Sequence, residues 1–159
     1  MKAVMISIRP EWVTKILSGE KTVEVRKTAP KLETPFRCYI YETQGKTDTP
    51  WIDEEGHTIF RGRGQVVAEF ICKRITTIAY TMDGFADVVD VNTSCLRPND
   101  FIEYGKGKPL YGWHISELKI YDKPINIGKF KVTVTNKAWS FQKKLERPPQ
   151  SWCYVEELR

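Results

Sequence analysis

The chain has 159 residues, of which 41% are hydrophobic and 28% are charged, a balance typical of a single globular domain that buries its own core. Its apolar runs are too short for a transmembrane helix, and its amino terminus lacks the long apolar stretch of a signal peptide, so we expect no membrane partner and a cytoplasmic location. The four cysteines form no Cys-x-x-Cys pair and lie away from both histidines. We therefore expect neither a zinc site nor a disulfide framework, and we predict no metal and no cofactor.

The net charge is +5, and residues 129–147 account for all of it. This segment holds six basic residues and one acidic residue, whereas the remaining 19 basic and 19 acidic residues cancel. A basic segment can be an electrostatic footprint for nucleic acid. It can equally be a solvated tail, and the charge count alone does not separate the two.

The amino-terminal quarter of the chain predicts three strands and one short helix. The apolar, β-branched run at residues 2–8 is typical of a buried strand. Pro10 suits the first turn of a helix, and Gly19 suits the position just after its end. Residues 21–27 and 36–43 alternate with the period-two pattern of strands.

The remaining chain adds mainly strands. Its predicted elements, in order, are a hairpin around Glu55 and Gly56 within the turn-rich residues 44–64, a long strand at 65–78, a helix at 95–104, a strand at 110–127 with a turn near Pro124, a short strand at 129–141, and a terminal strand after Pro149. Many strands with few, short helices predict an α+β fold, built on a twisted, mostly antiparallel sheet of barrel type rather than on alternating βαβ units.

One face of the predicted strand at 21–27 is polar. Thr22, Glu24 and Arg26 share this face because side chains alternate along a strand, and Lys21 stands at its entrance. The face either points to water or lines a site. A lysine, a glutamate and an arginine held together would position a phosphate or a carbonyl through charge-assisted hydrogen bonds. The carboxylate would also keep Lys21 charged, which favours a binding cleft over a hydrolytic one.

A second acidic residue, Glu69, interrupts the apolar strand at 65–78. If that strand is central, the carboxylate needs a partner, because burying it alone costs several kcal/mol. Lys21 and Arg26 are the candidate partners. If the strand lies at an edge, Glu69 faces water instead.

Two aromatic residues, Tyr111 and Trp113, flank Gly112 beside His114. An exposed ring at this position would stack on a base, as rings do in proteins that bind single-stranded nucleic acid. The alternative is that the rings belong to the core.

Several stretches together resemble the ASCH domain family of the PUA-like superfamily. The segment MISIRPEWVTKILSGEKTVEVRK, residues 5–27, is similar to the amino-terminal signature of that family, and GQVVAEF and LYGWHISELKIYDKP resemble later segments of phage-associated members. The tail RPPQSWCYVEEL is similar to the same subgroup. The resemblance implies an ASCH domain over residues 1–127 and a basic extension over residues 128–159, packed on the same domain.

The resemblance also implies a PUA-like barrel with short helices around it and a cleft that binds RNA or a modified nucleotide. By matching position, Lys21, Glu24 and Arg26 line this cleft, with Glu69 as a companion. Some bacterial members hydrolyse acetylated cytidine with a lysine and a threonine three residues further on. Here the lysine matches as Lys21, but Glu24 stands where the threonine would be.

The leading hypothesis is therefore a module that binds RNA or a nucleotide. A hydrolase of a modified nucleoside, or a ribonuclease, with Lys21 and Glu24 as catalytic residues, is the alternative. A protein-interaction module that uses residues 148–159 is a third possibility. The predicted ligand-binding residues are Lys21, Thr22, Glu24, Arg26, Glu69, Tyr111 and Trp113.

Overall fold

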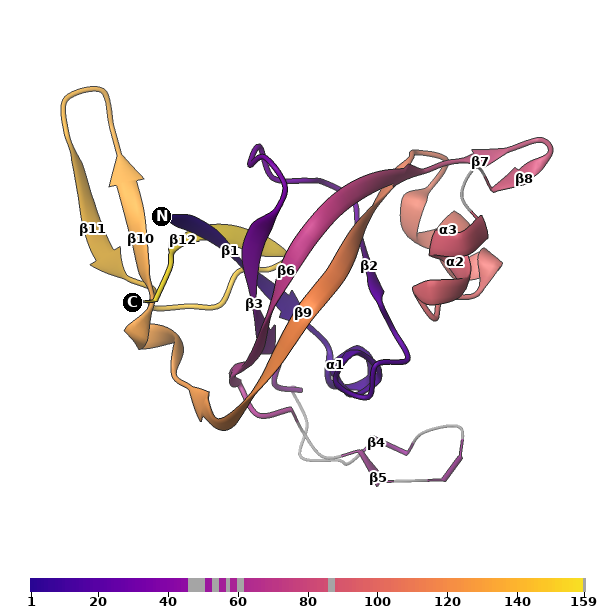
Figure 1. Ribbon diagram of the computed structural model, residues 1–159, viewed down its shortest axis with the longest axis horizontal. Coiled ribbons are helices and arrows are strands. Elements are labelled where there is room, and N and C mark those ends of the chain that lie inside the picture. Colours follow the sequence, from indigo (N-terminus) through magenta and orange to yellow (C-terminus); the bar gives the residue numbers. More distant parts are fainter. Residues whose placement is uncertain (46–50, 53–54, 57, 60–61, 86–87, 159) are drawn as a thin grey trace. The chain divides into compact units, whose positions relative to one another are not determined.

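The computed structural model of the chain describes residues 1–45, 51–52, 55–56, 58–59, 62–85 and 88–158 (Figure 1). The chain forms two compact units. The terminal unit comprises residues 1–14, 37–70 and 119–159, and the internal unit comprises residues 15–36 and 71–118. Each unit is described by itself below.

Two long strands contribute to both units. The first half of β6 (Gln65–Ile78) and the second half of β9 (Leu110–Ile125) belong to the terminal unit, and their other halves belong to the internal unit. The predicted strand at 65–78 is confirmed. The turn predicted near Pro124 is wrong, because β9 continues through it to Ile125; proline is tolerated near the end of a strand, where a missing N–H costs little.

The terminal unit is built on a sheet with the strand order β12-β1-β3-β6-β9. The first strand, β1 (Lys2–Ile8), pairs in parallel with β3 (Phe36–Glu42) and antiparallel with β12 (Trp152–Glu156). The terminal strand predicted after Pro149 is therefore confirmed as β12. A cluster of buried apolar side chains forms the core of the unit: Ala3, Met5, Tyr39, Tyr41, Val66, Phe130 and Val155.

Two hairpins extend the terminal unit. The first joins β4 (Trp51–Ile52) to β5 (Thr58–Ile59), which confirms the hairpin predicted around Gly56. After the 3-10 helix η1 (Ile127–Lys129), the second joins β10 (Lys131–Thr135) to β11 (Ser140–Lys144).

The single strand predicted at 129–141 is thus wrong. The chain reverses at Asn136, whose side chain accepts hydrogen bonds from the backbone N–H groups of Ala138 and Trp139 at 2.8 and 2.9 Å. Asparagine favours such turns because its side chain can bond the backbone two residues on.

The internal unit combines the strand order β6-β9-β2 with short helices. Its edge strand, β2 (Val23–Arg26), pairs antiparallel with β9. It is preceded by α1 (Pro10–Leu17), whose last turn lies in this unit. Gly19, just after α1, has a positive φ of 82°, the conformation that ends helices and favours glycine.

The other elements of the internal unit are a small hairpin and two helices. The hairpin joins β7 (Tyr80–Thr81) to β8 (Gly84–Phe85). Sequence reasoning missed α2 (Val88–Thr93) and began α3 (Pro98–Gly105) too early. Proline occupies the first position of α3 and Asp100 accepts a hydrogen bond from the N–H of Arg97, so the start of this helix is fixed at residue 98.

The structure confirms the α+β class, with short helices around a β-sheet. The sheet is open rather than closed: among the described residues, β12 and β2 each pair with a strand on one side only. No helix in the described ranges is long and apolar enough to cross a bilayer.

Candidate ligand-binding site

Lys21 is a buried cation in the link between α1 and β2, and it is only 2% exposed. Its ammonium group donates a hydrogen bond of 2.5 Å to the carbonyl oxygen of Ser94, just beyond α2. The backbone around it is also fixed. The N–H of Lys21 donates to Lys15, while Thr22 bonds Thr93 through its N–H and Ile115 through its carbonyl oxygen. The lysine is thus held between three elements of the internal unit.

Glu24 joins two cations. Its Oε2 lies 3.4 Å from Nζ of Lys21, and its Oε1 accepts from Nε and Nη2 of Arg26 at 3.1 and 3.0 Å. The side chains of Lys21, Glu24 and Arg26 are 2%, 8% and 11% exposed. These charges do not face water. The cluster places two basic side chains around one carboxylate where little water reaches them.

Burial lowers the pKa of Lys21 below its ordinary value, and the carboxylate of Glu24 opposes this shift only in part. The sequence pattern predicted the effect of the carboxylate on Lys21 but not the larger, opposing effect. The reason is the depth of burial, since removal from water disfavours the charged form of a lysine. A local sequence pattern cannot reveal that depth.

The predicted aromatic residues lie opposite this cluster on β9. Glu24 is the register partner of Trp113, and Arg26 is the partner of Tyr111. Residues directly opposite in an antiparallel pair present their side chains on the same face. Trp113 is fully buried, with its ring 6.0 Å from that of Phe36 in an edge-to-face arrangement, so for Trp113 the core alternative holds. Tyr111 is partly exposed and keeps the stacking hypothesis open.

The opposite face of β2 and β9 carries a second polar cluster that sequence reasoning missed. Asp90 of α2 accepts a hydrogen bond from the hydroxyl of Thr76, and its Oδ2 lies 3.1 Å from Nε2 of His114. Both Asp90 and His114 are buried. A Cβ atom at Gly112 would lie 2.8 Å from the Thr76 hydroxyl and 3.2 Å from Oδ2 of Asp90, so only glycine fits there. An aspartate within the apolar run at 88–91 was the available signal.

Glu69 lies in the terminal unit, and its partners there are Arg37, at 2.5 Å, and the hydroxyl of Tyr121, at 2.5 Å. The prediction that Lys21 or Arg26 pairs with Glu69 is wrong. Strands β3 and β9 flank β6 in the sheet and bring Arg37 and Tyr121 to it instead. Burial, followed by the hydrogen bond to Glu69, strongly raises the pKa of Tyr121.

Burial shapes the chemistry of most of the cysteines. Cys38 and Cys72 are buried, and burial raises the pKa of Cys72 to about 12 and that of Cys153 to about 11. Thiols shifted in this direction are poor nucleophiles at neutral pH. Within the part of the chain that the structure describes, no three His, Cys, Asp or Glu side chains come together as a metal site requires.

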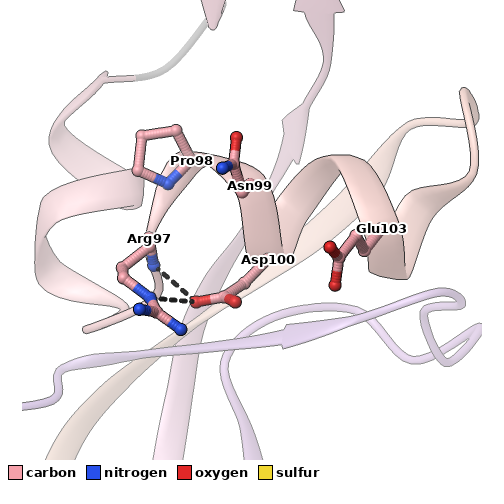
Figure 2. Close-up of a pocket in the computed structure, with 5 residues that line it drawn as sticks. All are labelled: Arg97, Pro98, Asn99, Asp100 and Glu103. Atoms are coloured by element: carbon pink, nitrogen blue, oxygen red, sulfur yellow. Dashed lines mark hydrogen bonds and ion pairs between the residues drawn. The ribbon is translucent and has the colours of Figure 1, made fainter.

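An open pocket lies at the start of α3 (Figure 2). Its lining residues are Arg97, Pro98, Asn99, Asp100 and Glu103. Asp100 is occupied in capping the helix, where it accepts from the N–H of Arg97 at 2.9 Å and lies 3.5 Å from its Nε. The pocket therefore reflects the helix cap and contains none of the predicted site residues.

The fold and the β2–β9 cluster together define a small α+β domain with buried charged side chains on one sheet face. The sequence profile of the ASCH domain matches residues 6–124, and the chain belongs to the ASCH domain family. The match ends before the β10–β11 hairpin. No curated protein sequence matches the chain.

Solved structures share the fold at low sequence identity. An ASCH protein from Zymomonas mobilis has a TM-score of 0.64 at 18% identity, covering 98% of this chain and 88% of that one. A variant of it with serine replaced by alanine has a TM-score of 0.61 at 19% identity, with coverages of 98% and 89%. A variant with tyrosine replaced by phenylalanine has a TM-score of 0.61 at 18% identity, with coverages of 99% and 92%. Likeness at this level of identity establishes the fold alone.

Proposed function

We propose that this ASCH domain binds RNA or a nucleotide through the face of β2 and β9 that carries Arg26 and Tyr111. The observation that carries the proposal is the sharing of one carboxylate, Glu24, by two cations, one of which is almost fully buried. Burying a charge is costly unless the structure pairs it. A lysine kept at this depth, beside a carboxylate that it shares with Arg26, supports a binding site for an anion at this face.

Each side chain has a role that its position supports. Arg26 is the most exposed of the three charged groups, and a guanidinium matches a phosphate with paired hydrogen bonds. Glu24 orients it through two contacts. Lys21 adds positive charge at a buried position, where little water is present to screen its interaction with an anion. Tyr111, directly opposite Arg26, offers a ring on which a base can stack.

Binding measurements test the proposal. Fluorescence anisotropy with labelled single-stranded RNA, and calorimetry with nucleoside monophosphates, are performed at low salt on wild type and Lys21→Met. Methionine has a similar length but no charge, so the variant is expected to keep the fold and to bind at least about tenfold more weakly. If wild type binds no probe of either kind, or if Lys21→Met binds as tightly as wild type, the proposal is wrong.

A hydrolase is the second candidate, and one observation favours it. Burial lowers the pKa of Lys21, which is the direction of shift that a lysine acting as a general base requires. Glu24 takes the place of the threonine expected from acetylcytidine hydrolases, so the carboxylate would be the second catalytic group. Incubation of acetylated cytidine and of RNA with wild type and Lys21→Met, followed by mass spectrometry, decides the matter. Turnover that disappears in Lys21→Met supports this function, and absence of product from both proteins excludes it for these substrates.

The protein-interaction hypothesis required an available carboxyl-terminal segment. In the terminal unit, β12 pairs along β1, and Ser7 donates a hydrogen bond of 2.6 Å to the carbonyl oxygen of Pro149. Val155 is 1% exposed. The segment is built into the sheet, and this hypothesis therefore ranks third.

A further inference from the structure

The β10–β11 hairpin, residues 131–144, combines exposed aromatic rings with lysines. It forms a two-stranded sheet of its own in the terminal unit (Figure 1), beyond residues 6–124 that match the ASCH profile. Trp139 is 55% exposed and Phe141 is 44% exposed. Single exposed apolar residues are ordinary, but neighbouring ones form a patch that suggests a partner.

The two rings act as one platform. Their centroids lie 5.0 Å apart with an angle of 38° between the planes. Asn136 fixes the turn that carries Trp139, since its side chain accepts from the backbone N–H of that residue and its own N–H donates to the Trp139 carbonyl at 2.9 Å. The platform is therefore held in place before any partner arrives, which reduces the entropy cost of binding.

Lysines lie on both faces of the hairpin that carries the platform. Phe141 and Lys143 share a face of β11 because side chains alternate along a strand, and Lys137 lies in the turn. On the other face, Lys131 and Lys144 are direct register partners. Like charges directly opposite each other destabilise a strand pair. An anion placed between them would relieve that repulsion.

Four lysines lie on the hairpin, and all are exposed. Among the residues that the structure describes, none of Lys131, Lys137, Lys143 and Lys144 takes part in an ion pair. A neutral residue of the hairpin, Thr133, donates a hydrogen bond of 2.7 Å to Glu156. Within the described part of the chain, no carboxylate therefore offsets the charge of these lysines through an ion pair.

We infer that the β10–β11 hairpin is a second contact surface, and that it takes single-stranded nucleic acid. Bases stack on Trp139 and Phe141, while the lysines neutralise phosphates. This combination of rings and a basic surface is the one that sequence-tolerant single-strand binders use. A protein partner would not require the uncompensated lysines, and a duplex would hide its bases from the rings. The inference does not depend on the β2–β9 site.

The test measures binding of a short single-stranded RNA, a duplex of the same sequence and vesicles containing anionic lipid. The proteins are wild type, Trp139→Ala with Phe141→Ala, Lys137→Gln with Lys143→Gln, and a control, Lys73→Gln with Lys108→Gln, which removes two exposed lysines from the internal unit.

The aromatic variant is expected to bind the single strand roughly tenfold or more weakly than wild type. For the lysine variant, the slope of log affinity against log salt should become shallower by about 1.4, since each neutralised phosphate contributes about 0.7 for single strands. The control variant should keep the wild-type affinity and slope. The residues are exposed, so circular dichroism should show every variant folded.

Several results would overturn the inference. Unchanged affinity and slope in both hairpin variants is one, and an equal loss on duplex and single strand is another. A loss confined to vesicles, or a change only in self-association by sedimentation, would assign the hairpin to a membrane or a protein. If Lys21→Met loses binding while the hairpin variants do not, the inference about the hairpin is wrong and the proposed function is unaffected. If the hairpin variants lose binding while Lys21→Met does not, the proposed function is wrong and the inference about the hairpin is unaffected.

Discussion

Two glutamates in this chain have similar surroundings and different charge balance. In the internal unit, Glu24 is held between Lys21 and Arg26. In the terminal unit, Glu69 is held between Arg37 and the neutral hydroxyl of Tyr121.

The first cluster places two basic side chains around one carboxylate, and all three are almost fully buried. The second places one basic side chain between two carboxylates, because Glu157 lies 4.0 Å from Arg37, and its groups are partly exposed. A buried lysine with a perturbed pKa is a candidate for a functional site, and the partly exposed second cluster has no such group.

The largest expected effect is the loss of stability in Glu24→Gln compared with Glu69→Gln. Removing the carboxylate from Lys21 leaves a buried cation without its counter-charge, which costs about 3–5 kcal/mol. Glu69→Gln should cost about 1–2 kcal/mol, because its side chain and that of Arg37 are partly exposed and solvent compensates. Urea unfolding followed by tryptophan fluorescence measures both. Equal losses would show that the two clusters do not differ in the way described.

Asp90→Asn should come next. It weakens the cluster with Thr76 and His114 on the opposite face of β2 and β9 and should cost about 1–3 kcal/mol of unfolding free energy. RNA binding by the folded variant should stay at the wild-type level, because none of these side chains lies on the face of Arg26. A loss of affinity without a loss of stability would place this cluster in the site.

The pH dependence of stability should separate Lys21 from other groups. Its folded-state pKa is lowered by burial, so the unfolded chain binds more protons in the window between the lowered value and the ordinary one, about 10.4. The unfolding free energy of wild type should therefore rise with pH through that window, relative to Lys21→Met. Each unit of pKa shift corresponds to about 1.4 kcal/mol. Chemical unfolding of both proteins at a series of alkaline pH values gives the difference, and parallel curves would contradict the shift.

Tyr121→Phe is expected to have the smallest effect. It removes one hydrogen bond to Glu69, which retains Arg37, and should cost about 0.5–1.5 kcal/mol. RNA binding should not change. Thermal and urea unfolding measure the change in stability, and fluorescence anisotropy measures RNA binding. A weakened affinity would show that the Glu69 cluster takes part in binding.

The sequence predicted the parts of the site that depend on local spacing. Lys21, Glu24 and Arg26 are close in the chain, so a strand with a polar face was enough to group them. Their burial could not be predicted, because it depends on Ser94 and Trp113, which come from distant elements. As a result, the local pattern could not predict that burial lowers the pKa of Lys21.

The side chains that contact Glu69 come from distant strands, so local sequence patterns could not predict them either. Tyr121 is 52 positions from Glu69 and Arg37 is 32 positions from it, so their meeting depends on strand order. Helix α2 was missed because its β-branched residues favour strands. It is held by tertiary contacts, among them the hydrogen bond from the N–H of Thr22 to Thr93. Such contacts routinely override weak local propensity.

The salt dependence of single-stranded RNA binding in Arg26→Gln tests the central claim most directly, with Arg37→Gln as the matched control. Both variants remove an arginine that is paired with a glutamate, one from the Glu24 cluster and one from the Glu69 cluster. If Arg26 neutralises a phosphate, its variant should show weaker binding and a slope shallower by about 0.7, while Arg37→Gln should retain the wild-type line. Wild-type affinity and slope in Arg26→Gln, or the same change in both variants, would contradict the account.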